Sequence, residues 1–293
     1  MVSQIDNQAT IGVNTIRPLS KEQIAQYHEN GFVIVPRFFS FEEIEPIQKA
    51  CNDNVNLGGA IVQYLDKNGN ANKLTYWTEL GDSLLGIILR LARMVDAVEI
   101  LMGGKKAYHF YSKIVKKEAH SQARIEWHSG YGSWYSMDCL FPYFVSSFIA
   151  IDQNTKKNGC IQVLKKSHLL GRIDHVLIGE GLFCESKRME KIEEKLELVS
   201  CEMEPGDILF MDANTIHRSL ENNSDDVRHN LASHYNAVEN QPVSQATQQI
   251  YPYQPLIKLP DSAILNNLDK SVFLNQKFIK HDDVFKTVIH GEK

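Results

Sequence analysis

Residues 127–135 read WHSGYGSWY, and residues 206–217 read GDILFMDANTIH. The first stretch carries His128 at the end of a short predicted strand. In the second stretch a Gly-Asp turn precedes the apolar run 208–211, which is typical of a strand, and His217 follows shortly after. The two histidines therefore lie at the ends of two predicted strands, and this pairing directs the interpretation of the whole chain.

Two histidines in this setting indicate a metal site. Proteins commonly coordinate ferrous iron with two imidazoles and one carboxylate on one face, which leaves the other face open for a 2-oxo acid and dioxygen. One strand supplies two such ligands only from positions i and i+2, because alternate side chains point the same way. His128 and position 130 have this spacing, but Gly130 carries no ligand.

Arg228 is the third candidate residue and follows His217 by eleven residues. That separation leaves room for a turn rich in Asn, Ser and Asp at 222–226 and for a return strand at 227–235. An arginine on such a strand can form a bidentate pair with a carboxylate. We therefore expect Arg228 to bind the distal carboxylate of 2-oxoglutarate.

These motifs occur in the order and at the spacing of a known family. The chain resembles the phytanoyl-CoA dioxygenase superfamily of iron(II)- and 2-oxoglutarate-dependent oxygenases, near the branch that contains ectoine hydroxylase. The resemblance runs from about residue 19 to residue 237 and rests on Asn30-Gly31-Phe32-Val33, Trp127-His128, Asn158-Gly159-Cys160, Ser167-His168, Gly206-Asp207, His217 and Arg228. It implies that His128 and His217 bind iron and that Arg228 holds 2-oxoglutarate.

The departure from the family pattern is Gly130, which stands where the family has aspartate. In the first interpretation the missing side chain opens a coordination position of halide size, and bound chloride or bromide restores the negative charge. Iron halogenases that resemble this family carry His-x-Gly or His-x-Ala. In the second, water or another carboxylate such as Asp138 takes the place and the enzyme hydroxylates. In the third, the site is degenerate or was altered by engineering, and the chain only binds metal or ligand.

The resemblance and Gly130 together favour a halogenase that uses iron(II), 2-oxoglutarate, dioxygen and chloride or bromide. The co-substrate would be decarboxylated to succinate, a hydrogen atom would leave an unactivated carbon, and halogen would take its place. A hydroxylase and a non-catalytic homologue that binds metal or ligand remain the alternatives. No feature marks a carrier-protein surface, so we expect the substrate to be a free small molecule such as an amino acid, a nucleotide or another natural product.

Three further residues are weaker candidates. Lys113 lies on a predicted strand at 108–115, where the resemblance implies contacts with 2-oxoglutarate and substrate, although a solvated lysine would look the same. Trp134 matches a family aromatic beside the substrate, and a core tryptophan is an equal interpretation. Trp77 belongs to an aromatic cluster that could line the mouth of the substrate pocket or simply pack in the core.

Composition excludes several classes of protein. The chain has 293 residues, of which 43% are hydrophobic and 23% charged, as in ordinary globular domains. The net charge of −5 provides no basic footprint for a nucleic-acid polymer or an anionic membrane. An odd number of cysteines, five, without Cys-x-x-Cys spacing favours a reducing, cytoplasmic location. No signal peptide is recognisable in residues 1–18.

The predicted elements indicate one mainly β domain. Capping boxes at Ser20 and Ser40 begin two helices, and a third, long helix is predicted from Asp82 or Ser83 to Met102. Short strands and turns then follow to residue 235, which favours a jelly-roll, and the resemblance implies the same cupin-like double-stranded β-helix with flanking helices. Three segments of this single domain are expected to lie outside the core: a flexible arm at 1–18, an insertion or lid with one solvated helix at 173–198, and a C-terminal extension at 241–293.

Overall fold

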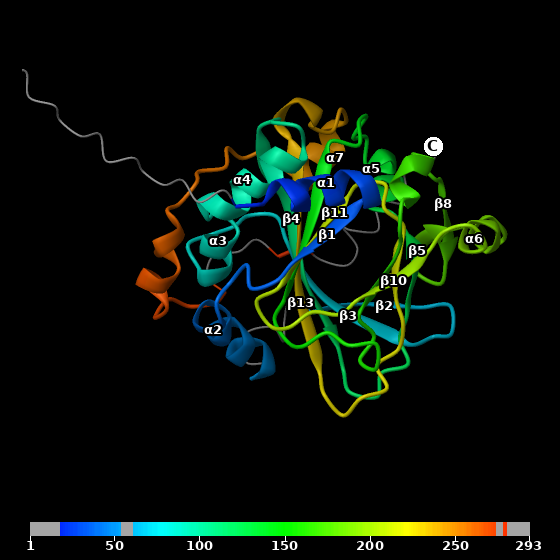
Figure 1. Ribbon diagram of the computed structural model, residues 1–293, viewed down its shortest axis with the longest axis horizontal. Helices are drawn as coiled ribbons and strands as arrows, with labels where there is room; N and C mark the ends of the chain where they lie inside the picture. The colour runs from blue at the N-terminus through cyan, green and yellow to red at the C-terminus, as the bar shows by residue number, and fades with distance from the viewer. Residues whose placement is uncertain (1–17, 54–60, 274–277, 280–293) are drawn as a thin grey trace, which may run out of the picture.

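The computed structural model describes residues 18–53, 61–273 and 278–279. Within them the fold is the expected double-stranded β-helix, with two main antiparallel sheets and flanking helices (Figure 1). The larger sheet contains, in spatial order, β1 (Phe32–Val35), β11 (Ile208–Asp212), β6 (Phe144–Ala150), β13 (Arg228–Ala237), β4 (Ala107–Lys117), β3 (Ala71–Trp77) and β2 (Ile61–Leu65). The smaller sheet contains β10 (Leu198–Cys201), β7 (Ile161–Leu164), β12 (His217–Ser219) and β5 (Ile125–His128).

Strand alternation divides the apolar side chains between two layers. In β11, Ile208 and Phe210 belong to the core beneath the helices, whereas Leu209 and Met211 belong to the core between the two sheets. This is the two-residue period of a strand buried on both faces. One face of the larger sheet is therefore covered by helices, and the other is free to form a pocket with the smaller sheet.

The N-terminal helices cover the larger sheet and confirm both capping boxes. Helix α1 (Lys21–Asn30) begins after Ser20 and α2 (Phe41–Asn52) after Ser40, and each serine exchanges hydrogen bonds with the third helical residue. Gly31 ends α1 with φ +86°, and a Cβ there would lie 2.5 Å from the Nδ1 atom of His168. Glycine is required here for both its conformation and its size.

The prediction of one continuous helix from residue 82 or 83 to residue 102 is wrong. Ser83 does cap a helix, but that helix ends early, and two helices form, α3 (Leu84–Ile88) and α4 (Ala92–Leu101). At the break, Leu259 accepts a hydrogen bond from the amide of Ala92 and donates one to the carbonyl of Arg90. A distant segment thus takes the backbone groups that would have continued the helix.

The segment 173–198 also differs from the expected single helix. It begins with a separate hairpin, β8 (His175–Ile178) and β9 (Gly181–Cys184), and only then forms the solvated helix α6 (Ser186–Glu193). Figure 1 shows β8 and α6 beside the smaller sheet, on the side away from α2 to α4. The β8–β9 hairpin contributes to the pocket described below, and its role as a lid stays a prediction.

The remaining segments connect and surround the sheets. They include helix α5 (Gly130–Ser136), helix α7 (Gln245–Ile250) and the short 3-10 helices Ser167–Leu170, Val238–Asn240, Asp261–Ala263 and Leu265–Asn267. Most of the predicted N-terminal arm and part of the C-terminal extension lie outside the described residues. All five cysteines are free and buried. In the part of the chain that the structure describes, no helix is long and apolar enough to cross a membrane.

Candidate active site

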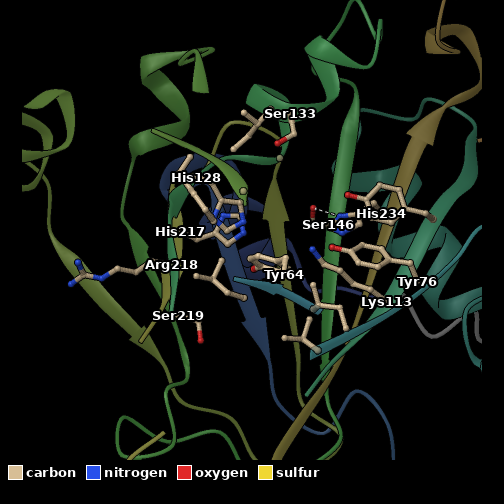
Figure 2. A pocket seen from close by; sticks show the side chains of 18 of the residues that line it. Tyr64, Tyr76, Lys113, His128, Ser133, Ser146, His217, Arg218, Ser219 and His234 are labelled. Atoms are coloured by element: carbon tan, nitrogen blue, oxygen red, sulfur yellow. Dashed lines mark hydrogen bonds between the residues drawn. The ribbon is translucent and has the colours of Figure 1, made fainter. Parts of the chain in front are cut away.

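The two predicted histidine ligands meet across neighbouring strands of the smaller sheet. His217 on β12 is the direct cross-strand partner of His128 on β5, and their ring centroids lie 4.1 Å apart. Figure 2 shows both rings together on one side of a pocket between the sheets. Cross-strand partners have closely spaced Cβ atoms, so the register of β5 and β12 is what brings the two imidazoles together.

Backbone carbonyls orient both imidazoles. Nδ1 of His128 is 2.8 Å from the carbonyl oxygen of Glu126, and Nδ1 of His217 is 3.0 Å from that of Thr215. A ring that donates Nδ1–H to a carbonyl keeps a lone pair on Nε2, the arrangement common in metal-binding histidines. Burial lowers the pKa of His128 well below its usual value and that of His217 to about 4. Both rings are therefore neutral near pH 7, as metal ligands must be.

Gly130 is the first residue of α5 and lines the same pocket. Across the described residues, no group of three or more His, Cys, Asp or Glu side chains is placed to hold a metal ion. Asp138, the alternative carboxylate, lies beyond the end of α5 and is not among the residues that line the pocket. The described protein atoms could thus offer a metal two imidazoles, and its other coordination positions would be left to external ligands.

Arg228 lies at the start of β13, where it is 1% exposed and lines the pocket. Its Nη1 donates to Oδ1 of Asn154 at 3.1 Å, and its Nη2 lies 3.4 Å from Oγ of Ser219. Asn230, with its amide oxygen turned toward Arg228, accepts from Nη1 at 2.7 Å. Neutral oxygens therefore surround this cation.

The guanidinium of Arg228 is under-satisfied for a buried charge. Its Nε atom is buried without a hydrogen-bond partner, and the carboxylate of Asp152, which is paired with His229, attracts the guanidinium only through a charge–charge interaction. Burial lowers the pKa of Arg228 to about 10, which still leaves it charged near pH 7. A buried cation is stable only when paired, so this site fits the carboxylate of a small anion.

The wall opposite the histidines is built by the larger sheet. Lys113 on β4 points into the pocket, with its Nζ 5.6 Å from the centre of the Tyr76 ring, and burial lowers its pKa to about 8. Figure 2 shows Lys113, Tyr76, Ser146 and His234 gathered on this side. Nδ1 of His234 is 2.9 Å from Oγ of Ser146, whereas its Nε2 is buried without a partner.

Sequence reasoning missed most of this wall. Its residues include Tyr64, Tyr76, Tyr111, Ser146, Asn230 and His234, whereas Ser219 lines the pocket from β12, the strand of His217. Strand alternation could have found some of them. On β13, Asn230 and His234 stand two and six residues after Arg228 and share its face, as Tyr111 shares that of Lys113 on β4.

The structure places the two tryptophan candidates in different environments. Trp134 lines the pocket, where its ring stacks on Phe144 with centroids 4.1 Å apart. Trp77 does not line it: this residue is fully buried in the core beneath the larger sheet. The expectation of Trp77 at the pocket mouth is therefore corrected. Its neighbour Tyr76 faces the pocket, because adjacent strand residues point to opposite faces.

Comparison with known proteins shows the family of the chain. The profile of the phytanoyl-CoA dioxygenase family matches residues 27–230, which include both histidines and Arg228. The chain belongs to the phytanoyl-CoA dioxygenase family. The match ends shortly after Arg228, so the C-terminal extension lies beyond the part that this family shares.

Relatives within and around the phytanoyl-CoA dioxygenase family are distant but cover most of the chain. Ectoine dioxygenase from Sphingopyxis alaskensis is 23% identical over 239 residues, or 76% of this chain and 78% of that protein. A probable alpha-ketoglutarate-dependent hypophosphite dioxygenase from Stutzerimonas stutzeri is 26% identical over 76% of this chain and 80% of that protein. The crystal structure of EctD from S. alaskensis with 2-oxoglutarate and 5-hydroxyectoine has a TM-score of 0.66 at 20% identity, covering 84% of this chain and 89% of that chain.

Proposed function

We propose that this protein is an iron(II)- and 2-oxoglutarate-dependent oxygenase that oxidises a carbon–hydrogen bond of a free small molecule. The observation that carries the proposal is the pair of neutral, carbonyl-oriented imidazoles of His128 and His217 in one pocket with the unpaired guanidinium of Arg228. The names of the relatives, an ectoine dioxygenase and an alpha-ketoglutarate-dependent dioxygenase, support it.

His128 and His217 would hold the metal through their Nε2 atoms. Arg228 would bind the distal carboxylate of 2-oxoglutarate, assisted by Ser219 and Asn230. An iron ion held here would, with 2-oxoglutarate and dioxygen, supply the oxidising power for removal of a hydrogen atom from carbon, and 2-oxoglutarate would be converted to succinate and carbon dioxide. Arg228 retains the co-substrate because a charge-assisted bidentate pair is stronger than the neutral contacts that it replaces.

Lys113 would supply the second positive charge toward the co-substrate. Its ammonium reaches into the pocket from the wall opposite the histidines, and its positive charge helps to lower the pKa of both His128 and His217. With a pKa of about 8 it is mostly protonated near pH 7. We propose that Lys113 offsets the negative charge of the bound anions, while the aromatic side chains of Tyr64, Tyr76 and Tyr111 form the substrate wall.

We propose that the reaction is a halogenation, because Gly130 provides no carboxylate. With Gly130, a metal held by His128 and His217 would lack the carboxylate that the family carries at this position, and among the described residues no third His, Cys, Asp or Glu is placed to complete the site. A halide anion carries the same single negative charge as the missing carboxylate. Chloride or bromide beside Gly130 would therefore restore the charge balance and be available for transfer to carbon.

Hydroxylation is the second candidate. The relatives reported above are named dioxygenases, and one further relative, from Streptomyces griseoviridis, is named L-proline trans-4-hydroxylase at 23% identity over 51% of this chain. These names favour transfer of oxygen. In that case water completes the metal site, and the product does not depend on halide.

Anaerobic spectroscopy tests both candidates without knowledge of the substrate. Iron(II) and 2-oxoglutarate are added to chloride-free protein, the metal-to-ligand charge-transfer band is recorded, and chloride is then titrated. A band that shifts with chloride supports halogenation, and a band that ignores chloride supports hydroxylation. Absence of any band, with no iron retained by the protein, would mean that the chain is a non-catalytic homologue.

Product analysis then separates the two oxidations. Small molecules are screened for faster succinate formation, and their products are weighed by mass spectrometry in chloride buffer and in sulfate buffer. Halogenation replaces one hydrogen by chlorine only in the chloride buffer. Hydroxylation adds one oxygen in both buffers, and that result would overturn the halogenase proposal.

A further inference from the structure

His234 is held firmly in the pocket wall that the larger sheet forms. It stands on β13, where its cross-strand neighbours are Ser146 on β6 and Tyr111 on β4. It is 5% exposed, its ring centroid lies 4.5 Å from that of Tyr111, and the ring of Trp134 packs against it edge to face at 5.2 Å. A ring packed in this way keeps one orientation, so the positions of its two nitrogens are fixed.

The two nitrogens of His234 differ in their surroundings. Nδ1 lies 2.9 Å from Oγ of Ser146, and Figure 2 shows this bond on the side of the pocket opposite His128 and His217. Nε2 is buried without a partner. A buried polar atom that lacks a partner costs free energy, and a ligand atom that bonds to it recovers that cost. Since His234 lines the pocket, a bound substrate can supply this atom.

Ser146 decides which nitrogen of His234 carries the hydrogen. Burial, reinforced by the positive charge of Lys113, lowers the pKa of His234 well below its usual value, so the ring is neutral near pH 7 and carries one N–H. A buried hydroxyl proton needs an acceptor, and among the described residues Nδ1 of His234 is the acceptor that Ser146 has. The hydrogen of the ring therefore sits on Nε2, as a donor that no described protein atom uses.

Lys113 adds a positive charge near this donor. Of the charged groups that act on the pKa of His234, it has the largest effect. No described carboxylate counters the burial that lowers the pKa of Lys113 itself to about 8. The carboxylate among the described residues that line the pocket is Glu180, which is bound to the amide of Leu65. An unused N–H and an ammonium without an acid partner together suit an oxyanion.

We infer that His234 and Lys113 form a substrate-binding subsite that recognises an oxyanion, a carboxylate or a phosphate, on the wall opposite His128 and His217. This inference rests on the proposed function and adds the substrate to the anions that Lys113 serves. A substrate anchored on this wall would be held by its charged end and would present a carbon toward the metal site, which is the orientation that such a reaction needs. The expected substrates thereby narrow to those that carry an anionic group, such as amino acids and nucleotides.

The tautomer of His234 is tested first, by heteronuclear NMR of the metal-free protein with isotope-labelled histidine. The signals of this ring are assigned by their loss in His234→Asn. Near pH 7 we expect a neutral ring with its hydrogen on Nε2, and in Ser146→Ala we expect the hydrogen to be shared between both nitrogens. A wild-type ring with its hydrogen on Nδ1 would overturn the inference, because Nε2 would then be an acceptor and would repel an oxyanion.

The ligand is tested with acetate, inorganic phosphate and neutral acetamide. Each is titrated into protein loaded with 2-oxoglutarate, chloride and zinc(II) in place of iron, and binding is followed through the indole N–H signal of Trp134, which packs against His234. We expect acetate or phosphate to bind at least about 10-fold more tightly than acetamide. Tighter acetate would indicate a substrate carboxylate, and tighter phosphate a phosphorylated substrate. Equal binding of all three would overturn the inference.

Two variants of His234 separate its donor from its bulk. Glutamine places an amide N–H near the position of Nε2, whereas asparagine places one near that of Nδ1. His234→Gln should keep the oxyanion affinity within about 3-fold, and His234→Asn should weaken it about 10- to 100-fold, as loss of a hydrogen bond to a charged group implies. A purely structural role of the ring would affect both variants alike, so equal affinities in the two would overturn the role of His234.

Failure of this inference can be distinguished from failure of the proposed function. Protein that retains neither zinc nor 2-oxoglutarate would overturn the proposed function, and the tautomer of His234 with the acetate titration of the metal-free chain would still decide whether the subsite exists. Protein that retains both, but binds acetate and phosphate no better than acetamide, would overturn the inference alone.

Discussion

At the scale of single residues, the polar atoms of the site fall into two groups: some have hydrogen-bond partners within the protein, and others have none. Nδ1 of His128 and Nδ1 of His217 are engaged by backbone carbonyls, which leaves their Nε2 atoms free to act as the proposed metal ligands. Arg228 shows the reverse case, a buried Nε with no partner. Satisfied atoms orient these side chains, and the unsatisfied one marks where a ligand completes the structure.

Arg228 provides the first residue-scale prediction. We expect Arg228→Gln to raise the apparent Kd for 2-oxoglutarate about 10- to 100-fold, because a hydrogen-bonded charge pair contributes about 1.5–3 kcal/mol. The measurement is an anaerobic titration of 2-oxoglutarate into the iron-loaded protein. Arg188→Gln, which changes an exposed arginine on α6, is the matched control and should bind normally. Equal affinities in the two variants would exclude Arg228 from the co-substrate site.

At the scale of elements, the β8–β9 hairpin is joined to the β2–β3 hairpin across the pocket. The carboxylate of Glu180 accepts from the amide of Leu65 at 2.6 Å, and the amide of Glu180 donates to the carbonyl of Leu65 at 3.0 Å. Gly179 has φ +62°, and a Cβ there would lie 2.7 Å from the carbonyl oxygen of Leu65. Only glycine allows this close approach of the two backbones.

The contact between the hairpins leads to a prediction about local opening. Glu180→Ala removes one of the two bonds, so we expect amide hydrogen exchange at 175–184 to become roughly 5-fold faster, as loss of about 1 kcal/mol implies. Exchange is followed by mass spectrometry on the metal-free protein. Glu185→Ala removes an exposed carboxylate from the same segment and should leave the rate unchanged. If both variants exchange alike, Glu180 does not hold the hairpin closed.

At the scale of the whole molecule, histidines buried within the larger sheet make stability depend on pH. Nδ1 of His109 is 3.0 Å from the carbonyl of Thr78, and its Nε2 is 2.7 Å from Oγ of Ser112, which lies 2.7 Å from Oγ of Ser233. Burial lowers the pKa of His109 to about 3. The folded chain keeps this ring neutral in a pH range where the unfolded chain protonates it.

The sign of this effect follows from the two pKa values of His109. Its contribution to stability is complete above the unfolded value near 6.5 and is lost as the pH falls toward 3. Between pH 7 and pH 5 we expect His109 to account for a loss of about 2 kcal/mol in the free energy of unfolding. Urea denaturation of metal-free wild type and His109→Gln at both pH values measures it. The exposed His120→Gln is the control and should keep the wild-type difference.

Much of the fold follows from local patterns in the sequence. The capping boxes at Ser20 and Ser40, the strand positions and the return strand of Arg228 are all set within a few residues, where periodicity and hydrogen bonding of neighbours decide the structure. The helix break near Leu91 and the β8–β9 hairpin could not be predicted in this way. The first depends on Leu259 and the second on contacts with the β2–β3 hairpin, both far away in the sequence.

The sequence by itself determined the chemistry of the site: two imidazoles, a glycine two residues after the first of them, and an arginine on the return strand. Only the tertiary structure decided how these groups meet. The register of β12 against β5 places His217 opposite His128, strand alternation sends Tyr76 to the pocket and Trp77 to the core, and packing lays Trp134 onto Gly130. The physical reason is range, because residue types and spacings are local properties, whereas register and close packing arise from contacts between segments that are distant along the chain.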